Sequence, residues 1–354
     1  MKPHSLRKTV LCLSIAAAFS STVASATGVA QAQWNGSVDG QWTDSNNWDG
    51  SLPPQAGGDA LVTDSALTGN AVTDVTYTNP GDANPGSVAD SLDWVVVDGA
   101  PSSNMTLNQG TDNLSTSRLT VGESGTGIYN MTGGSLAVTL DDVNVDTLTL
   151  GRQDNSVGTF NQSGGDVTVG RVISLGQTAG SIGTYNLNTG SSVSGFITMG
   201  FGGYGELNQQ AGTTNTVGSD IYMNNAAYNL TGGSLTVNGT QGVIVGTVGT
   251  STFAQTGGTL AITQGNLTVG NQGTGTFIQH AGEHTVGGDL IIASQASAGG
   301  SSFTLDTTAR PSSLAVSGNL VVGQEGKGTL TQDGGSNTVD HTLVCRPEQH
   351  GRRE

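Results

Sequence analysis

The stretch LTVGNQGTGTFI, residues 267–278, decides the fold because the chain returns to it repeatedly. A copy has a short apolar strand that usually ends in glycine, then an aromatic or leucine anchor that follows a small residue. In all copies but one, a turn such as Gly-Gly lies four and five residues after the anchor. Successive anchors are 21 to 31 residues apart, a period that predicts a solenoid. The nine anchors are Tyr129, Phe160, Tyr185, Leu207, Tyr228, Phe253, Phe277, Phe303 and Leu330.

Three strand-like pieces in each copy identify the type of solenoid. They alternate apolar with polar residues and are rich in Val, Thr, Leu and Ile, as half-buried strands are, and glycine marks the corners. No repeat has apolar residues at i, i+3, i+4 and i+7, which excludes helical solenoids. We therefore expect an all-β, single-chain parallel β-helix of about nine regular coils of 21–31 residues. Its coils would stack about 4.8 Å apart, and its sense would be right-handed by the general preference of parallel crossovers.

Asparagine follows the anchor in five copies. Stacked asparagine amides can hydrogen-bond along a rod, so we interpret these residues as a structural ladder rather than a ligand groove. They are Asn130, Asn161, Asn186, Asn208 and Asn229.

Composition restricts the partners. The chain has 354 residues, 56 of them glycine, and a net charge of −16. Its 11 basic residues form no stripe, which argues against nucleic acid and anionic membrane surfaces as partners. Cys12 and Cys345 lie near opposite ends, so we expect no disulfide in the body. No motif implies a cofactor.

Residues 1–26 have the pattern of a secretory signal peptide. Lys2, Arg7 and Lys8 precede an apolar run at 10–19, and Ala24-Ser25-Ala26 offers a cleavage site. The apolar run is too short to span a membrane, and no later segment is apolar enough to do so. We therefore expect an exported protein.

Residues 27–58 contain three of the four tryptophans: Trp34, Trp42 and Trp48. We interpret this segment as an N-terminal cap, because the first coil of a rod otherwise exposes its strand edges. The alternative is a glycan site in which sugar rings stack on Trp42 and Trp48.

The remaining chain divides into three parts. Residues 59–118 are strand-rich but irregular, and we expect them to form the first coils of the same rod; residues 119–344 carry the regular repeats. Residues 345–354 abandon the repeat pattern abruptly. We interpret them as aberrant or out-of-frame sequence, with a genuine short polar tail as the alternative. Strand edges left open at this end would favour self-association of the C-terminal coil.

The W…W…NW opening, followed by GTYN…GG…LTVG copies, resembles the passenger regions of bacterial autotransporters and related secreted β-strand-repeat proteins. The resemblance covers about residues 33–344. It implies a β-helix secreted by a Gram-negative bacterium or held on its outer cell surface. It also implies an adhesin-like, structural or presenting role, with a glycan or cell-surface ligand as a possible partner.

Two motifs bear on metal binding. His280-Ala281-Gly282-Glu283-His284 matches H-x-x-E-H, but that zinc motif needs a helix, and Ala281-Gly282 is the turn of the repeat. Asp142, Asn144 and Asp146 alternate like the start of a calcium loop but lack the Gly and Glu that complete it. We expect no metal, and these three residues are the calcium candidates.

An enzyme is the alternative function. Many polysaccharide lyases and hydrolases are β-helices, so this fold does not exclude catalysis. Such a site needs paired carboxylates or a basic residue in a groove. Arg118, Arg152 and Arg171 could supply the base, near the acidic residues of 141–154. The short turns elsewhere favour a non-catalytic rod.

Overall fold

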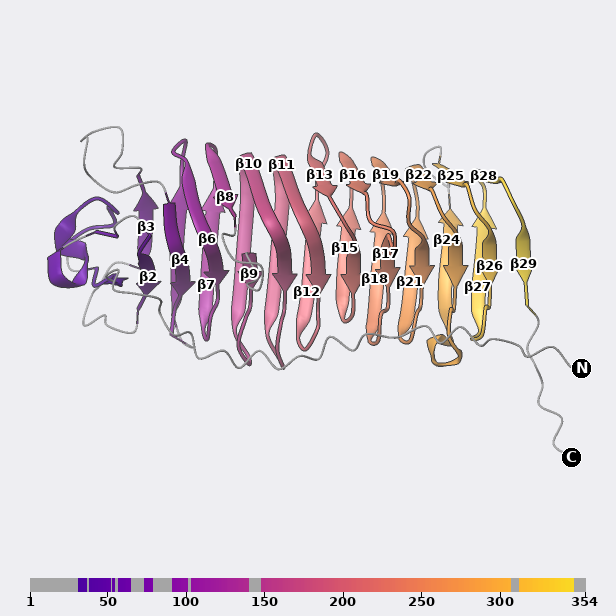
Figure 1. The fold of residues 1–354 in the computed structure, drawn as a ribbon, viewed down its shortest axis with the longest axis horizontal. Helices are drawn as coiled ribbons and strands as arrows, with labels where there is room; N and C mark the ends of the chain where they lie inside the picture. The colour runs from indigo at the N-terminus through magenta and orange to yellow at the C-terminus, as the bar shows by residue number, and fades with distance from the viewer. Residues whose placement is uncertain are drawn as a thin grey trace, which may run out of the picture.

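The computed structural model is a straight rod whose strands lie side by side along its long axis (Figure 1). The chain forms an all-β parallel solenoid of about 11 turns, which confirms the predicted fold class. The handedness stays a prediction. The structure describes residues 31–36, 38–51, 53–54, 57–64, 73–78, 91–100, 103–139, 148–306 and 312–346.

Most coils have three strands, and each strand pairs in parallel with its counterpart in the next coil, so the strands form three columns. The anchor column carries the predicted anchors. It contains β3 (Asp74–Tyr77), β5 (Asn104–Gln109), β7 (Thr126–Met131), the first parts of β10 (Val157–Leu175) and β11 (Ile182–Met199), β12 (Tyr204–Gln209), β15 (Ala226–Leu230), β18 (Thr250–Gln255), β21 (Thr274–Gln279), β24 (Ser301–Asp306) and β27 (Gly328–Asp333).

The second column follows the turn after each anchor strand. It contains the start of β6 (Leu114–Val121), β8 (Ser135–Val138), the middle of β10 and β11, β13 (Thr214–Val217), β16 (Ser234–Val237), β19 (Thr259–Ile262), β22 (Gly282–Val286), β25 (Ser312–Val316) and β28 (Ser336–Val339).

The third column completes each coil. It contains β1 (Ala32–Gln33), β2 (Asp59–Thr63), β4 (Ser91–Asp98), the ends of β6, β10 and β11, β9 (Leu148–Leu150), β14 (Ile221–Met223), β17 (Val243–Val245), β20 (Leu267–Val269), β23 (Leu290–Ile292), β26 (Leu320–Val322) and β29 (Leu343–Cys345). In the described part of the chain, three short 3-10 helices lie outside the columns: η1 (Ser45–Asn47), η2 (Asp49–Ser51) and η4 (Ala296–Ala298). Strands that precede Leu119 join the same sheet, which is why the turns outnumber the nine regular repeats.

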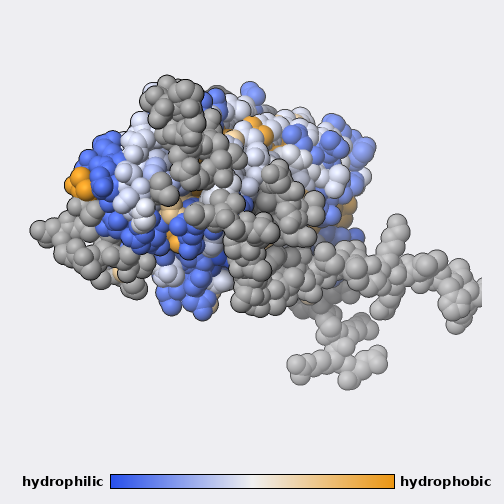
Figure 2. Space-filling view, turned by 60° about the vertical axis from the view of Figure 1, so that its left-hand side comes forward, coloured by the Kyte–Doolittle hydropathy of each residue, from blue (hydrophilic) through white to orange (hydrophobic). Residues whose placement is uncertain are grey.

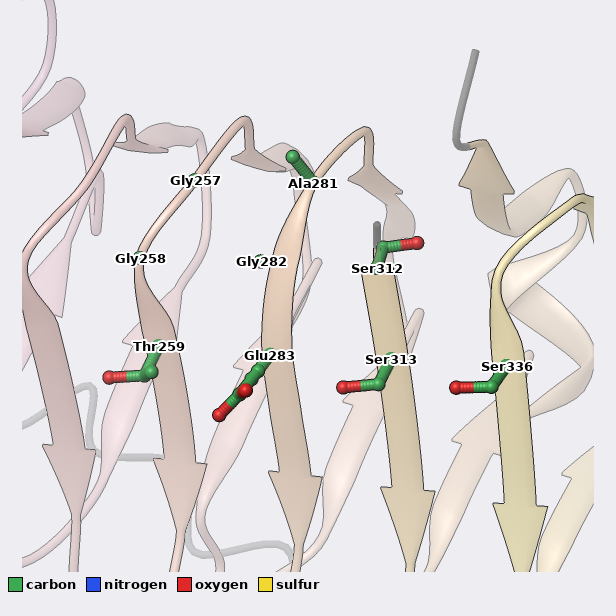
Figure 3. A pocket seen from close by; sticks show the side chains of 9 residues that line it. All are labelled: Gly257, Gly258, Thr259, Ala281, Gly282, Glu283, Ser312, Ser313 and Ser336. Carbon is green, nitrogen blue, oxygen red and sulfur yellow. The ribbon is translucent and has the colours of Figure 1, made fainter. Parts of the chain in front are cut away.

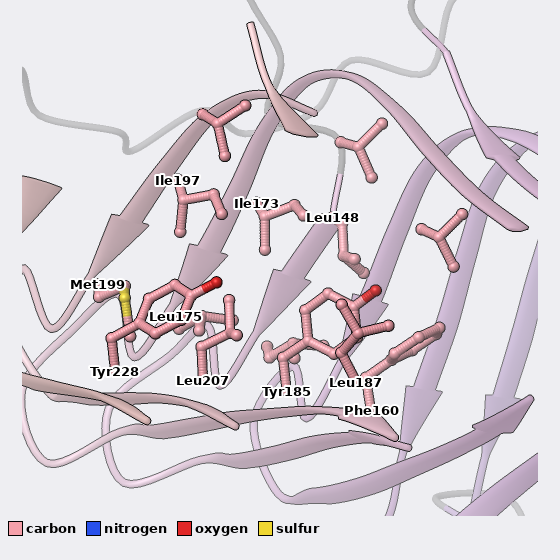
Figure 4. Packing of buried hydrophobic residues seen from close by; sticks show 14 of the residues in the cluster. Leu148, Phe160, Ile173, Leu175, Tyr185, Leu187, Ile197, Met199, Leu207 and Tyr228 are labelled. Carbon is pink, nitrogen blue, oxygen red and sulfur yellow. The ribbon is translucent and has the colours of Figure 1, made fainter. Parts of the chain in front are cut away.

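All nine predicted anchors lie in register in the anchor column, and Val75 and Leu107 extend the row toward the N-terminus. From Val75 to Phe303 they are fully buried, and they pack with the apolar residues of the other two columns (Figure 4). The rings from Tyr228 to Phe303 are nearly parallel, with centroids 4.7 to 4.8 Å apart. This spacing equals the distance between neighbouring strands, so the aromatic row and the backbone ladder reinforce each other.

Glycine at the corners is required by both conformation and space. Gly270, at the end of the quoted strand, has a φ of +78°, a region that residues with a Cβ avoid. A Cβ on Gly275 would lie 2.2 Å from the carbonyl oxygen of Val245 in the preceding coil. Some copies depart from this rule: Asn224 takes the corner position after β14, and Ala293 takes it after β23 with a φ of 55°.

Three tryptophans pack at the N-terminal end of the rod. Trp34 and Trp42 each contact Trp48 edge to face, at 5.1 and 4.9 Å, and Trp42 contacts Tyr77 of the first anchor strand in the same way. Each indole is at most 1% exposed. The indole N–H of Trp48 donates to the carbonyl oxygen of Trp42 at 2.8 Å. These residues therefore extend the hydrophobic core beyond the first complete coil.

Candidate functional site

A ladder of asparagine amides runs along the outer face of the anchor column. Each Nδ2 donates to the Oδ1 of the preceding asparagine, at 2.8 to 2.9 Å. The five predicted residues form this ladder, and Asn108 adds a sixth member that the sequence analysis missed. Because the amides bind one another, they serve to connect coils, as predicted. The ladder stops after Asn229, where Ala254 takes the next position.

Inside the rod, glutamine and tyrosine side chains connect consecutive coils. A glutamine two residues after an anchor accepts a hydrogen bond from the tyrosine hydroxyl of the next coil. Three such pairs, with oxygen–oxygen distances of 2.6 to 2.7 Å, are Gln109–Tyr129, Gln162–Tyr185 and Gln209–Tyr228. The glutamine amides donate to backbone carbonyls at the following turn or in the next coil. Burial raises the pKa of Tyr228, so its phenol stays protonated and keeps donating.

Two glutamines lack this hydroxyl partner. Gln255 and Gln279 precede coils whose anchors are Phe277 and Phe303, and the Oε1 atom of each is buried without a hydrogen-bond partner. The sequence carries a signal for these pairs. Each tyrosine anchor, from Tyr129 to Tyr228, is preceded by a coil that has glutamine two residues after the anchor of that coil.

A shallow groove of about 550 Å³ crosses four coils at the turn between the first and second columns. Thr259, Glu283, Ser313 and Ser336 occupy the same register position in β19, β22, β25 and β28, and their side chains point the same way (Figure 3). Gly257, Gly258, Ala281, Gly282 and Ser312 complete the lining. Small residues at the turn leave the space, and the polar row borders it. Among the described lining residues, Glu283 supplies the only carboxylate.

A charged cluster lies on Trp94 of β4. Arg118 and Arg152 lie over its ring at 4.8 and 5.7 Å. Arg152 pairs with Glu123 at 2.7 Å, and Arg118 approaches Asp93 at 3.6 Å. Both cations are therefore neutralised by neighbouring carboxylates.

The same cluster affects Asp59, which is in register with Trp94. Burial, and secondarily the charge of Asp93, raise the pKa of Asp59, while Arg118 opposes the change. The structure thus brings together Arg118 and Arg152. Arg171 lies farther along, within β10.

The acidic segment predicted to accompany these arginines falls mostly outside the described residues. Asp141, Asp142, Asn144 and Asp146 all lie there, so the calcium candidates have no described geometry. Asp154 is exposed at the turn after β9. Among the residues that the structure does describe, no group of three or more His, Cys, Asp or Glu side chains could hold a metal ion.

The two glycan candidates are buried. Trp42 and Trp48 are each 1% exposed, and edge-to-face contacts with neighbouring rings hold both indoles in the core. A sugar ring stacks on an open aromatic face, and neither residue presents one in this structure. Their packing instead favours the capping interpretation.

The H-x-x-E-H residues are divided between a turn and a strand. Gly282 to His284 belong to β22, and His280 is the first residue after β21. The Nδ1 atom of His280 lies 3.4 Å from a carboxylate oxygen of Asp306. His284 points into the core, where its ring lies beside the aromatic row, with its centroid 5.0 Å from that of Phe277 and 6.3 Å from that of Phe303. Burial lowers the pKa of His284 to about 3, and neither ring nitrogen has a hydrogen-bond partner. The helix that a zinc site of this class needs is not formed here.

On the face that Figure 2 shows, the coloured surface is blue and white with a few separate orange residues. The large exposed apolar residues of the described ranges are Val38, Ile182, Val193, Phe201, Val248 and Leu343. A search of the described helices finds none that could span a membrane.

Neither the family models nor the curated proteins nor the solved structures include a match to this chain.

Proposed function

We propose that this chain is an exported, non-catalytic β-solenoid, secreted or displayed on the outer surface of a Gram-negative bacterium. It acts in the manner of an autotransporter passenger, as an adhesin or a structural, presenting rod. The proposal rests on the observation that polar side chains of the rod hydrogen-bond to one another between consecutive coils. The asparagine ladder and the Gln–Tyr pairs connect coil to coil, which produces an elongated and rigid body.

The state of the arginines supports a non-catalytic role. A general base or an anion clamp must present its functional group to substrate. Arg152 is instead paired with Glu123, whose carboxylate also accepts from Gln153 at 2.7 Å. To test the enzyme alternative, a panel of polysaccharides is screened for sugar release or unsaturated products. Any activity that Arg152→Ala abolishes would refute the non-catalytic proposal.

Export rests on residues 1–26. The test is to produce the full chain in a Gram-negative host and to sequence the N-terminus of the product found outside the cytoplasm. Cleavage after Ala26 and digestion of the rod by protease added to intact cells are the expected results for a displayed protein. A chain that keeps Met1 and remains in the cytoplasm would refute the proposal.

For a glycan or cell-surface ligand, the groove beside Glu283 offers a contact surface within the described part of the rod. Its polar row repeats once per coil, which suits an extended ligand that follows the rod axis. Binding to a glycan array is compared between wild type and Glu283→Ala. Asp166→Ala is the matched control, because Asp166 occupies the same register position five coils before Glu283, outside the groove. Equal loss in both variants would exclude the groove as the binding surface.

A further inference from the structure

Three buried polar side chains lie close together in the core, where the coil of β11 meets the coil of β12 and β13. Ser192 and Ser194 are inward-facing residues of β11, and Asn215 of β13 is the register neighbour of Ser192. Ser192 and Asn215 are 0% exposed, and Ser194 is 2% exposed. Within the described residues, both serine hydroxyl oxygens and the Oδ1 atom of Asn215 lack a hydrogen-bond partner. We call these three residues the polar core cluster.

Ser194 is an exception in its row. One residue of each coil occupies this inward position of the second column, and the other members of the row are all valine or isoleucine. A hydroxyl buried in such a row costs stability unless a hydrogen bond compensates for the hydration it has lost. The presence of serine here therefore points to a partner for its hydroxyl. The row is Val138, Val169, Ser194, Val217, Val237, Ile262, Val286, Val316 and Val339.

The protein groups around the cluster are engaged elsewhere. The backbone of β11 pairs with β10 on one side and with β13 on the other, and the Nδ2 atom of Asn215 donates to the Tyr228 hydroxyl at 3.0 Å. Ser192 lies near Tyr185, because its hydroxyl opposes the rise in the pKa of Tyr185 that burial causes. The Tyr185 hydroxyl nevertheless donates to Gln162, and no hydrogen bond joins it to Ser192. The cluster therefore has two hydroxyl donors and one amide oxygen acceptor that no described protein group uses.

The side chains around the cluster leave room for a small molecule. Ser192 and Ser194 align with two valines of the preceding coil, and each serine lacks one of the two branches of a valine. The anchor of the next coil is Leu207, a smaller side chain than the tyrosines on either side of it (Figure 4). Hydrogen bonds between coils hold the strands about 4.8 Å apart, so the coils cannot close around these smaller side chains. The space that two missing branches leave is comparable with the roughly 30 Å³ that a water molecule occupies in the liquid.

We propose that an ordered water molecule binds inside the rod at the polar core cluster. It accepts hydrogen bonds from the hydroxyls of Ser192 and Ser194 and donates one to the Oδ1 atom of Asn215. About three hydrogen bonds to otherwise unpaired groups are typical of a buried water molecule. A metal cation fits less well, because the three neutral oxygens bring no negative charge to offset its loss of hydration. This proposal does not depend on the proposed function.

The water connects two coils that lack the Gln–Tyr pair found at neighbouring junctions. Leu187 occupies the position at which the coils before and after it have glutamine. Leu207 occupies the position at which the coils before and after it have tyrosine. A bridge from Ser192 through the water to Asn215 takes the place of the missing pair, since a water-mediated hydrogen bond is nearly as favourable as a direct one.

A crystal structure of the full chain, at a resolution that shows ordered water, tests the site directly. Density for one water oxygen is expected about 2.7–3.2 Å from both serine hydroxyls and from Oδ1 of Asn215. In Ser194→Val, which restores the residue type of the row, this density should be absent. Wild-type crystals without the density, or with Ser192 bonded directly to Asn215 in its place, would overturn the proposal.

Stability measurements test the same site in solution. Ser194→Ala should lower Tm by a few degrees, because the water loses one of its partners. Without a bound water, the same change would remove an unpaired buried hydroxyl and raise Tm. Val237→Thr is the control, because it adds a hydroxyl to the same row between Val217 and Ile262 and should lower Tm. A higher Tm in Ser194→Ala together with a lower Tm in Val237→Thr would also overturn the proposal.

Discussion

Replacing Phe303 with tyrosine should stabilise the rod. The preceding coil places two unsatisfied groups at this position, the Oε1 of Gln279 and the ring nitrogens of His284. The corresponding site one turn after Leu207 is complete. There the Tyr228 hydroxyl donates to Gln209 at 2.7 Å and accepts from the Nδ2 of Asn215 at 3.0 Å.

The new hydroxyl should point in the required direction. The rings from Tyr228 through Phe253 and Phe277 to Phe303 are stacked with interplanar angles of 12°, 6° and 3°, so all four share one orientation. His284 occupies the position that Asn215 has in the earlier coil. The tyrosine can therefore donate to Gln279 and accept from an N–H of His284.

The expected gain follows from these contacts. Each net hydrogen bond contributes about 1 kcal/mol, and part of it offsets the desolvation of the hydroxyl. Phe303→Tyr should raise the free energy of unfolding by about 1 kcal/mol, which is a few degrees in Tm. Thermal and urea unfolding of the two proteins measure the difference.

Phe160→Tyr is the matched control. The preceding coil supplies Met131 and Leu136 at the two partner positions, so this hydroxyl would be buried without a partner and should cost about 1–3 kcal/mol. If both substitutions destabilise the rod to the same degree, the pairing rule between glutamine and the next anchor is wrong.

Three further substitutions test other features. His284→Leu, which matches its register neighbours Leu260 and Leu314, should make stability less dependent on pH. The pKa of His284 is about 3 in the folded state, so only the unfolded chain binds this proton as the pH falls below about 6.5. The free energy of unfolding of the wild type should therefore fall by up to about 1.4 kcal/mol per pH unit more than that of the variant. Equal dependence on pH in acid unfolding would contradict this. Asn186→Ala breaks two rungs of the amide ladder and should cost about 1–2 kcal/mol in urea unfolding, more than the same change at the terminal Asn229; an equal loss would argue against the ladder. Ala293→Gly relieves a left-handed backbone and should raise Tm, with a gain of about 1 kcal/mol, and a lowered Tm would show that the buried methyl group matters more.

The anchor row could be read from the sequence because its signal is local and repeated. A small residue, a ring such as Phe277 and a following Gly-Gly or Ala-Gly turn recur at nearly constant spacing, and stacking converts that spacing into register. The same pattern identifies the ladder residue Asn186 but not Asn108, because the coil of Leu107 has Thr111-Asp112 where most other coils have the glycine turn.

The candidate sites were harder to predict from the sequence. Trp42 and Trp48 could have been either cap or exposed sugar platform by composition alone, and only the fold determines which surface covers an indole. The groove beside Glu283 arises from aligned small residues in neighbouring coils, a property of stacking that no single repeat contains. Arg152 pairs with Glu123, which lies 29 positions earlier in the chain. This separation corresponds to one coil, but no sequence motif marks the pair.

The alternation of Gln–Tyr junctions with apolar junctions distinguishes each coil from its immediate neighbours. Between Gln109 and Phe253, a coil that skipped its neighbour and paired with the one beyond would set glutamine against Phe160, Leu207 or Phe253, and would set Met131 or Leu187 against a tyrosine. Every such slip leaves buried polar atoms without partners. Copies that resemble one another are prone to misassembly during folding. Where they alternate, the hydroxyl and amide groups thus favour pairing between consecutive coils over pairing that skips a coil.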